Sequence, residues 1–339
     1  MNSHPDKWAY HEEYAHYAEQ FDPMNYDRQA RRRRKPRIDP HQGPSREEVV
    51  EELADTAGLE SGFNTTYQPG RYEEGWLLQS LRPFFDQQLI EDVMAVVKGG
   101  KEANVYRCAG TRASGEQWLA AKVYRPRMFR HLRNDKVYRQ GRAVLDVDGK
   151  EVEPHEARTM RALEKKSNFG QQVAHTSWLM YEYTTLKTLH AAGADVPRPL
   201  AASDNAILMS YVGGEQMAAP TLNGVSLGLD EAAPLFKKVL HNVELMLEND
   251  LIHGDLSAYN ILYWQGDVTL IDFPQVVDSQ GNPDAFEILE RDITRVCEYF
   301  AGQGVRCDAH QVFQTLWRRY LEPDPELVAA DLSRMEIGD

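Results

Sequence analysis

A short stretch between residues 251 and 273 constrains the fold of this chain more than any other part of the sequence. It contains three short apolar runs bounded by Gly-Asp and Gln-Gly-Asp turns, so each run predicts a small buried strand. The runs are 251–252, 261–264 and 268–271. The sequence therefore predicts a polar loop that holds Asp255 and Asn260, followed by a hairpin whose far strand delivers Asp272 beside them.

The three polar side chains of this stretch have the chemistry of a metal site. Carboxylate and amide oxygens such as those of Asp255, Asp272 and Asn260 suit a hard cation such as Mg²⁺. One carboxylate is left over to act as a base. Together they predict the catalytic half of a phosphoryl-transfer site, in which a protein mainly positions the reactants and balances their charge.

Length and composition limit the class of protein to which the chain can belong. At 339 residues the chain can bury a real core, and we expect one two-lobed domain with appendages. A hydrophobic fraction of 42% and a charged fraction of 27% are ordinary for a globular protein. No apolar run approaches the ~20 residues of a membrane span, and the N-terminus lacks the apolar core of a signal peptide. The three cysteines show neither metal-type spacing nor a disulfide framework, so we expect a cytoplasmic protein without a membrane partner.

Charge is unevenly distributed along the chain. The net charge of -14 argues against a surface that coats nucleic acid. Residues 1–70 are predicted to be largely disordered, with a basic run at 28–37 and a short helix near 45–58, and an acidic tail is expected at 321–339. The basic run fits either a solvated arm or an arm that binds RNA, a ribosome or an acidic partner. The sequence leaves both interpretations open.

Two further features lie upstream of this stretch: a glycine turn between two predicted strands, and a lysine in a third predicted strand. The turn includes Gly99 and Gly100, whose backbone N–H groups can approach a phosphate closely. Glycine turns between strands are common and usually structural. Lys122 lies in a third strand, 119–124, where a lone lysine more often reaches out to water. Because it precedes the Asp255 cluster, however, it becomes a candidate for the lysine that holds ATP phosphates.

Helical periodicity predicts much of the remaining framework. The predicted helices are 76–89, 171–191, 229–247, 284–300 and 309–320. Glu182 lies in the second helix, where a glutamate is usually solvated, but Lys122 is available as its partner. Asp292, in the fourth helix, is a candidate acceptor of backbone N–H bonds from the Asp255 loop. The basic insert 125–170 fits a mobile functional loop or a solvated one.

Four motifs stand in order along residues 76–300. They are Gly100-Lys101-Glu102-Ala103-Asn104-Val105-Tyr106, Lys122-Val123-Tyr124, His253-Gly254-Asp255-Leu256-Ser257 with Tyr259-Asn260, and Ile271-Asp272-Phe273-Pro274-Gln275. Read together, the motifs resemble the RIO family of atypical protein kinases, most closely its type-one branch. The resemblance implies an α+β, two-lobed protein-kinase-like fold over residues 71–320, with an N-terminal helical extension. Its small, mainly β N-lobe would cover 76–212, and its mainly α C-lobe would cover 213–320.

The resemblance also implies roles for individual residues. The residues that match ATP-binding positions are Gly99, Gly100, Lys101, Lys122, Glu182, Met209, Tyr211 and Val212. The first three would cover the phosphates, Lys122 would hold them with Glu182 as its partner, and the last three match the hinge that receives adenine. Asp255 matches the catalytic aspartate, while Asn260 and Asp272 match the metal ligands. In some members ATP hydrolysis runs through a phospho-aspartate, which in this chain would form on Asp272.

The chain departs from the family's pattern in two places. The family commonly has Ser-Thr before the Gly-Lys-Glu-Ala run, whereas this chain has Lys98-Gly99 there. The exchange removes both hydroxyl groups, including that of the serine, and adds a positive charge near the phosphates. Lys122 and Glu182 are sixty residues apart, so the intervening loop is longer than usual.

Three hypotheses for the function follow. The first is a Mg²⁺-ATP-dependent serine/threonine protein kinase or ATPase, with Mn²⁺ as an alternative metal, that transfers the γ-phosphate to a protein hydroxyl or to itself. The family links such proteins to maturation of the small ribosomal subunit. The second is a small-molecule kinase of the aminoglycoside or choline type, against which the turn at 101–104 and the segment 273–275 argue. The third is a non-catalytic, ATP-gated assembly factor that binds RNA or a ribosome through 28–37, and the sequence identifies no protein substrate.

Overall fold

The computed structural model of the chain describes residues 65–100, 102–125, 142, 144–146, 149–152, 161, 165 and 168–322. All of them belong to one unit of the chain, Leu53–Asp339. Several predictions therefore lie outside the described residues. These are the helix near 45–58, the basic run 28–37, the glycine-turn residue Lys101, most of the insert 125–170, and the acidic tail beyond Glu322.

The smaller lobe is built on a five-stranded sheet. Its strands are β1 (Ile90–Gly99), β2 (Ala103–Gly110), β3 (Trp118–Tyr124), β4 (Pro199–Ala202) and β5 (Ala206–Ser210). All neighbours pair antiparallel in the order β1-β2-β3-β5-β4, so β5 joins β3 after a long excursion of the chain. The predicted strand 119–124 is confirmed, and β5 ends at Ser210, before the glycines that follow.

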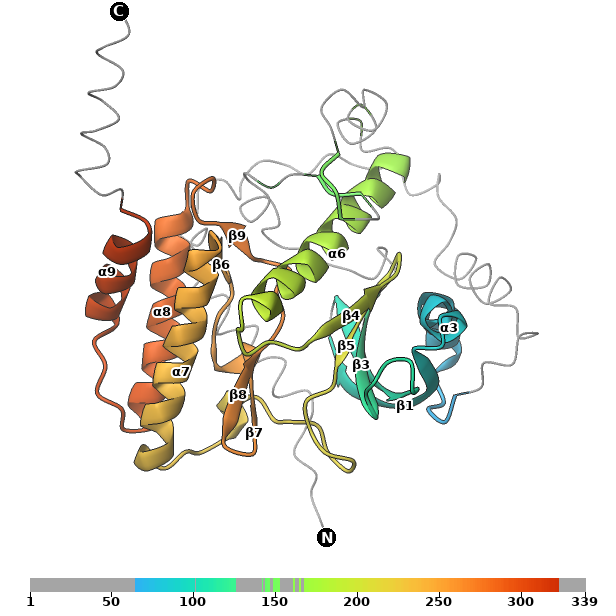
Figure 1. The fold of residues 1–339 in the computed structure, drawn as a ribbon, viewed down its shortest axis with the longest axis horizontal. Coiled ribbons are helices and arrows are strands. Elements are labelled where there is room, and N and C mark those ends of the chain that lie inside the picture. Colours follow the sequence, from blue (N-terminus) through green and yellow to red (C-terminus); the bar gives the residue numbers. More distant parts are fainter. Residues whose placement is uncertain are drawn as a thin grey trace, which may run out of the picture. The chain divides into compact units, whose positions relative to one another are not determined.

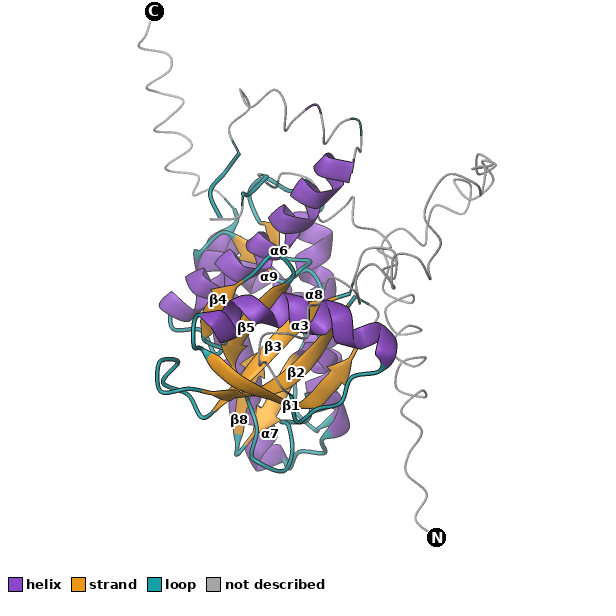
Figure 2. Cartoon of the chain, turned by 90° about the vertical axis from the view of Figure 1, so that its right-hand side faces the viewer, coloured by secondary structure: helices purple, strands orange, loops and turns teal. Residues whose placement is uncertain are grey.

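Helix α3 (Arg71–Asp86) lies across one face of this sheet, as Figure 2 shows. Its fully buried Leu81 and Phe84 pack with Tyr106 and Cys108 of β2 in a core that belongs to the smaller lobe. Apolar residues that return every three or four positions give the helix one stripe that faces the strands. The helix predicted at 76–89 is thus confirmed, although it begins earlier and ends three residues sooner.

The other face of the sheet joins the larger lobe. Helix α6 (Asn168–Ala191), predicted at 171–191, packs against β4 and β5. Tyr124 of β3, Leu186 of α6 and Phe273 belong to one continuous core with the helices of the larger lobe. The two lobes therefore share a buried apolar interface, which fixes the sheet above the loops that follow β6 and β8.

The larger lobe is mainly helical. Its elements are η5 (Leu222–Gly224), α7 (Leu229–Glu248), β6 (Leu251–Ile252), η6 (Ala258–Asn260), β7 (Ile261–Trp264), β8 (Asp267–Leu270), β9 (Val277–Asp278), α8 (Ala285–Gly302) and α9 (Ala309–Tyr320). Figure 1 shows α7, α8 and α9 side by side, and all three pairs of helices are in contact. The helices predicted for this region are confirmed to within two residues at each end. No helix among the described residues is both long and apolar enough to cross a membrane.

The predicted hairpin is present as β7 and β8. Its strands pair from Ile261 with Leu270 to Trp264 with Asp267. The two residues between them, Gln265 and Gly266, both have a left-handed φ, as a tight hairpin turn that matches the strand twist requires. The α+β, two-lobed fold with an N-terminal helix is thus confirmed, while the boundaries 71–320, 76–212 and 213–320 stay predictions.

Replacing Leu81 by Ala tests whether α3 is an integral part of the smaller lobe. Leu81 is fully buried, so the change should lower the free energy of unfolding by about 2–5 kcal/mol, measured by urea titration. Gln79→Ala, on the exposed side of the same helix, is the matched control and should unfold as the wild-type chain does. Equal unfolding midpoints for the two variants would contradict the packing of α3 on the sheet.

Candidate active site

The glycine turn between β1 and β2 has a conformation that depends on Gly100. A Cβ at Gly100 would lie 2.7 Å from the carbonyl oxygen of Ala103, so this position excludes any side chain. At Gly99, by contrast, a Cβ would meet only the Asn104 Oδ1 at 3.8 Å. The turn is therefore tight at its second glycine and open at its first.

The buried side chain of Asn104 connects this turn to helix α3. Its Oδ1 accepts hydrogen bonds from the Gly100 N–H at 3.3 Å and from the Arg125 guanidinium at 3.1 Å. Its amide nitrogen donates to Glu73 of α3 at 3.3 Å and to the Tyr106 hydroxyl at 3.0 Å. Because all these partners meet on one amide, α3 helps to hold the shape of the turn.

Lys122 forms the centre of the site. Its Nζ lies 2.6 Å from Oε1 of Glu182 and 2.5 Å from Oδ1 of Asp272, so one ammonium group joins β3, α6 and the segment after β8. The Tyr124 hydroxyl, two residues along the same strand face, donates to the other oxygen of Glu182. Glu182 is 1% exposed, whereas the side chain of Asp272 is 41% exposed. Of the two carboxylates, Asp272 is therefore the one that a ligand can reach.

Lys122 and Asp272 hold each other in their charged forms. Burial alone would lower the pKa of Lys122, but the carboxylates of Asp272 and Glu182 outweigh it and raise that pKa well above its ordinary value. Burial would likewise raise the pKa of Asp272, but the Lys122 ammonium lowers it below its ordinary value. Asp272 also has a left-handed φ of 73°, a conformation that a non-glycine residue rarely adopts outside constrained sites.

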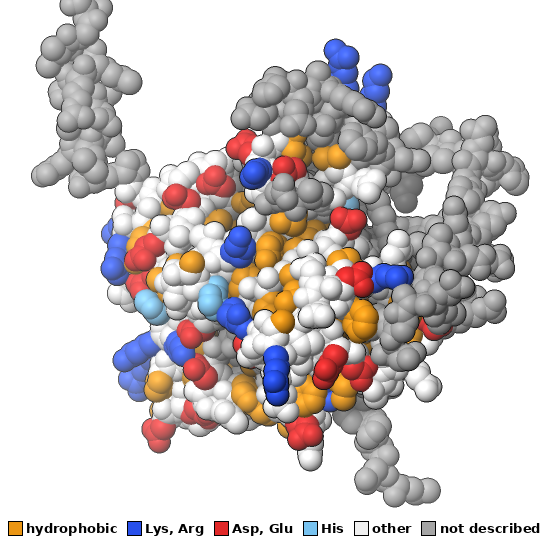
Figure 3. All heavy atoms as spheres, turned by 45° about the vertical axis from the view of Figure 1, so that its right-hand side comes forward, with side chains coloured by type: hydrophobic (Ala, Val, Ile, Leu, Met, Phe, Trp, Pro, Cys, Tyr) orange, Lys and Arg blue, Asp and Glu red, His pale blue; other side chains and the backbone are white. Residues whose placement is uncertain are grey.

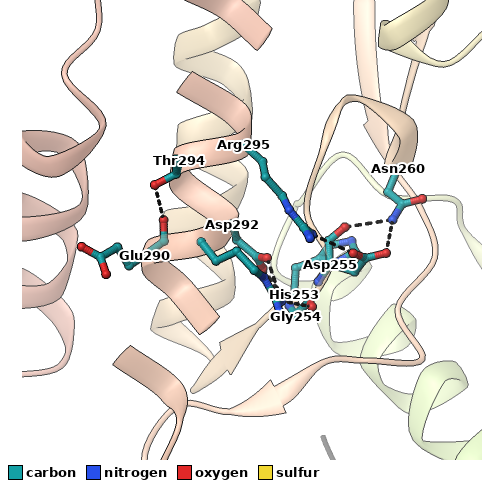
Figure 4. Close-up of polar contacts among 9 residues, drawn as sticks. His253, Gly254, Asp255, Asn260, Glu290, Asp292, Thr294 and Arg295 are labelled. Carbon is teal, nitrogen blue, oxygen red and sulfur yellow. Dashed lines mark hydrogen bonds and ion pairs between the residues drawn. The ribbon is translucent and has the colours of Figure 1, made fainter. Parts of the chain in front are cut away.

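The loop after β6 brings Asp255 and Asn260 into contact. The Asn260 amide nitrogen donates to Oδ2 of Asp255 at 3.1 Å and to the Asp255 carbonyl at 2.9 Å. Because the nitrogen is turned to Asp255, the side-chain oxygen of Asn260 points away from it (Figure 4). The Ile271 N–H donates to the Asn260 carbonyl at 2.9 Å, so Asp272 directly follows a residue bonded to Asn260. The oxygens expected to bind a metal thus come from adjoining backbone segments.

Helix α8 holds this loop through one group of residues (Figure 4). Asp292 accepts the Gly254 N–H at 2.8 Å, which confirms the prediction that Asp292 fixes the loop backbone. Arg291 donates to the Gly254 carbonyl. Arg295, 3% exposed, donates to Oδ1 of Asp255 at 2.8 Å. The orientation of the Asp255 carboxylate is therefore set by α8 and by Asn260 together.

The backbone at Gly254 leaves no room for another residue. Its φ is +81°, and a Cβ there would lie 2.2 Å from the carbonyl oxygen of Gln275. The segment that contains Gln275 is itself held by Arg142, whose guanidinium donates to the carbonyls of Pro274 and Val276 and lies 4.3 Å from the Tyr181 ring. The loop of Asp255 and the segment after Asp272 therefore pack backbone against backbone.

The predicted hinge residues lie at the end of β5 and directly after it. Met209 is buried and pairs with Ala120 of β3. Tyr211 packs near the guanidinium of Arg107, which lies 5.9 Å from its ring and donates to the carbonyl of Glu215. The Val212 carbonyl accepts the Ala219 N–H at 3.1 Å. The hinge is thus anchored by side-chain and backbone contacts.

The structure gathers some predicted site residues and separates others. Lys122, Glu182 and Asp272 are in direct contact, as are Asp255 and Asn260. In the described part of the chain, no hydrogen bond joins Gly99, Gly100 or the hinge to these groups. Nor do the described residues contain a cluster of three or more His, Cys, Asp or Glu side chains suited to a metal. A metal here would be held by Asn260 and Asp272 together with ligand oxygens, a set that suits Mg²⁺.

Two contributors were missed by the sequence reasoning. Arg295 stands in no motif and looks like an ordinary residue of a helix, while Tyr124 belongs to the Lys122-Val123-Tyr124 motif but was given no role of its own. A signal for Arg295 did exist, because Ile288, Asp292 and Arg295 recur at helical spacing on the buried side of α8. A charged residue that falls within an apolar stripe indicates a buried partner.

Replacing Arg295 by Met should destabilise the fold, because the Asp255 carboxylate would lose its buried cation. The side chains of Arg295 and Asp255 are 3% and 16% exposed, so we expect a loss of about 3 kcal/mol in the free energy of unfolding. Arg306→Met, at an exposed position just beyond α8, is the matched control. Adding Asp255→Asn to Arg295→Met should recover part of the loss in a double-mutant cycle. Additive effects of the two changes would contradict the pairing.

Comparison with known proteins relates the chain to one family. A family model described as the RIO domain matches residues 104–313. The RIO-type serine/threonine-protein kinase Rio1 of Thermoplasma acidophilum is 36% identical over 135 residues, which are 40% of this chain and 69% of that protein. The serine/threonine-protein kinase RIO1 of Caenorhabditis elegans is 29% identical over 216 residues, which are 62% of this chain but 37% of that protein. The chain therefore spans little more than a third of the nematode relative.

A solved structure shows a looser likeness. The crystal structure of the Rio2 kinase-ADP/Mg²⁺-phosphoaspartate complex from Chaetomium thermophilum has a TM-score of 0.48 and 19% identity, and covers 79% of this chain and 75% of that one. The RIO domain model, in contrast, spans more than half of the present sequence and includes Lys122, Glu182, Asp255, Asn260 and Asp272. The chain belongs to the RIO domain family.

Proposed function

We propose that the chain is a Mg²⁺-ATP-dependent phosphotransferase that acts as a serine/threonine protein kinase. The observation that carries the proposal is the contact of Lys122 with both Glu182 and Asp272, beside the Asp255–Asn260 pair. Phosphoryl transfer asks a protein mainly for positioning and for charge compensation. The relatives named as serine/threonine-protein kinases favour a protein hydroxyl as the acceptor over a small molecule.

The residues present fit a Mg²⁺ ion. The Asn260 side-chain oxygen is turned away from Asp255, and the Asp272 carboxylate is 41% exposed. Asn260 and Asp272 would hold the ion, and Mn²⁺ would suit the same oxygen ligands. When bound, the ion would neutralise charge on the phosphate oxygens.

Charge balance explains why the nucleotide would need this metal. In the structure, one ammonium, that of Lys122, faces two carboxylates, those of Glu182 and Asp272. A polyphosphate that enters such a site is repelled unless further positive charge accompanies it. Lys122, kept in place by Glu182, would then contact the phosphates, and the hinge at Met209, Tyr211 and Val212 would receive the base.

Asp255 would align the incoming hydroxyl and accept its proton as the γ-phosphoryl group is transferred. Its carboxylate is held by Arg295 and Asn260, so its orientation is set before a substrate arrives. A preoriented group avoids the cost of reorganisation in the transition state. Water in place of the hydroxyl would give ATP hydrolysis, and transfer to the exposed carboxylate of Asp272 would give a phospho-aspartate and ADP.

The wider setting belongs to the same proposal. We place the protein in the cytoplasm and assign the basic run 28–37 a contact with RNA or the ribosome, on its composition alone. The kinase domain would cover 71–320. The phosphate-covering role of Gly99, Gly100 and Lys101 rests on the tight turn at Gly100.

Replacing Asp255 by Ala should abolish turnover while largely sparing ATP binding. Because this carboxylate acts on the acceptor and not on the nucleotide, we expect the rate of phosphate release or transfer to fall by about 10²–10⁴-fold. ATP affinity, measured by calorimetry, should change little. Asp204→Ala, on an exposed turn between β4 and β5, is the control. Full turnover in the Asp255→Ala variant would refute the assigned role.

Replacing Asp272 by Ala should remove the part of nucleotide binding that depends on Mg²⁺. The change takes away a ligand oxygen and also releases Lys122 from one carboxylate. Titration of ATP with Mg²⁺ and with EDTA should therefore show a large difference for the wild-type chain and little difference for the variant. An unchanged Mg²⁺ dependence would exclude Asp272 as a metal ligand.

A further inference from the structure

Lys98 stands in the same cross-strand row as Lys122. In the register of the sheet, Lys98 of β1 lies opposite Val105 of β2, and Val105 lies opposite Lys122 of β3. Residues directly opposite each other in an antiparallel pair project from the same face. Lys98 and Lys122 therefore project from one face, with Val105 between them.

The face they share is the one that turns toward the active site. Tyr106, the next residue after Val105, is packed in the core of the smaller lobe beneath α3. Val105 points to the opposite side and packs against the core of the larger lobe. Since neighbouring strands are about 4.8 Å apart, the backbones at Lys98 and Lys122 are separated by about 10 Å. Strand β2 and the Val105 side chain fill the space between the two backbones, so a ligand would contact both lysines only above the face of the sheet.

The surroundings of the Lys98 ammonium also differ from those of the Lys122 ammonium. Lys98 is exposed, and it directly precedes the open glycine of the turn, Gly99. Its ammonium is thus free to move toward a ligand, whereas that of Lys122 is shared between two carboxylates.

We propose that Lys98 is a second phosphate-binding lysine, which contacts the polyphosphate of a nucleoside triphosphate from the β1 side while Lys122 contacts it from β3. The proposal rests on the proposed function, since it assigns Lys98 to the same nucleotide site. The proposal gives a role to position 98, where the RIO family commonly has a serine and this chain has a lysine. A flexible cation there would supply the positive charge that Lys122, already paired, supplies only in part.

Calorimetric titration with ATP, ADP and adenosine tests this role, with and without Mg²⁺. The variants are Lys98→Ser, which restores a hydroxyl, and Lys98→Arg, which keeps the charge. Lys237→Ser, an equal loss of charge at an exposed position of α7, is the control. Lys98→Ser should weaken ATP binding by about tenfold at low salt, the equivalent of one charge-assisted contact. The loss should be smaller for ADP, absent for adenosine, and reduced by added salt.

The result also separates this inference from the proposed function. If the wild-type chain binds no ATP, the proposed function fails and Lys98 loses its ligand with it. If the wild-type chain binds ATP and Lys98→Ser binds it equally well, only the inference about Lys98 is overturned. An equal loss for ATP and adenosine would overturn it too, because the change would then act on the shape of the sheet and not on phosphate. Retained ATP affinity in Lys98→Arg and Lys237→Ser completes the expected result.

Discussion

The catalytic arrangement depends on one buried ammonium group, that of Lys122. It joins the sheet of the smaller lobe to Glu182 of α6 and to Asp272 of the larger lobe, at 2.6 and 2.5 Å. A buried charge is costly unless its partners have good geometry, and removing one partner usually costs more than the pair contributes. Tyr124 supports the arrangement by donating to the second oxygen of Glu182. The two lobes are therefore aligned by the same contacts that would serve phosphate binding.

Helix α8 holds the loop of Asp255 in a similar way. Arg291, Asp292 and Arg295 lie within five consecutive residues of this helix and contact the backbone of Gly254 and the carboxylate of Asp255. A helix buried on one side is a rigid support, so side chains that project from it can hold a loop more closely than another loop could. The same packing requires a glycine at position 254, because the Gln275 carbonyl oxygen occupies the space that a Cβ would need.

The sequence predicted features that depend on neighbours along the chain better than features that depend on packing. The β7–β8 hairpin and the Asp255–Asn260 loop follow from short spacings, and both are present. The approach of Glu182 to Lys122 across sixty residues was expected because Lys122 was available as a partner and because of the family resemblance, and the structure brings the two together. Arg295 was missed because an arginine in an amphipathic helix is usually solvated. The roles assigned to these residues stay predictions.

The pairing of Lys122 with Asp272 has a consequence for the order of events in the proposed function. A lysine that neutralises Asp272 is not fully available to a phosphate, and an aspartate that neutralises Lys122 is not fully available to a metal. Lys122 and Asp272 would separate only if the nucleotide and the metal both arrive. A metal that binds Asp272 would free the Lys122 ammonium, which the phosphates require. Nucleotide and metal would thus bind with positive coupling, since each removes a cost that the other would otherwise meet alone. Lys98, which forms no ion pair with either carboxylate, lies outside this exchange and would offer its charge to the nucleotide from the start.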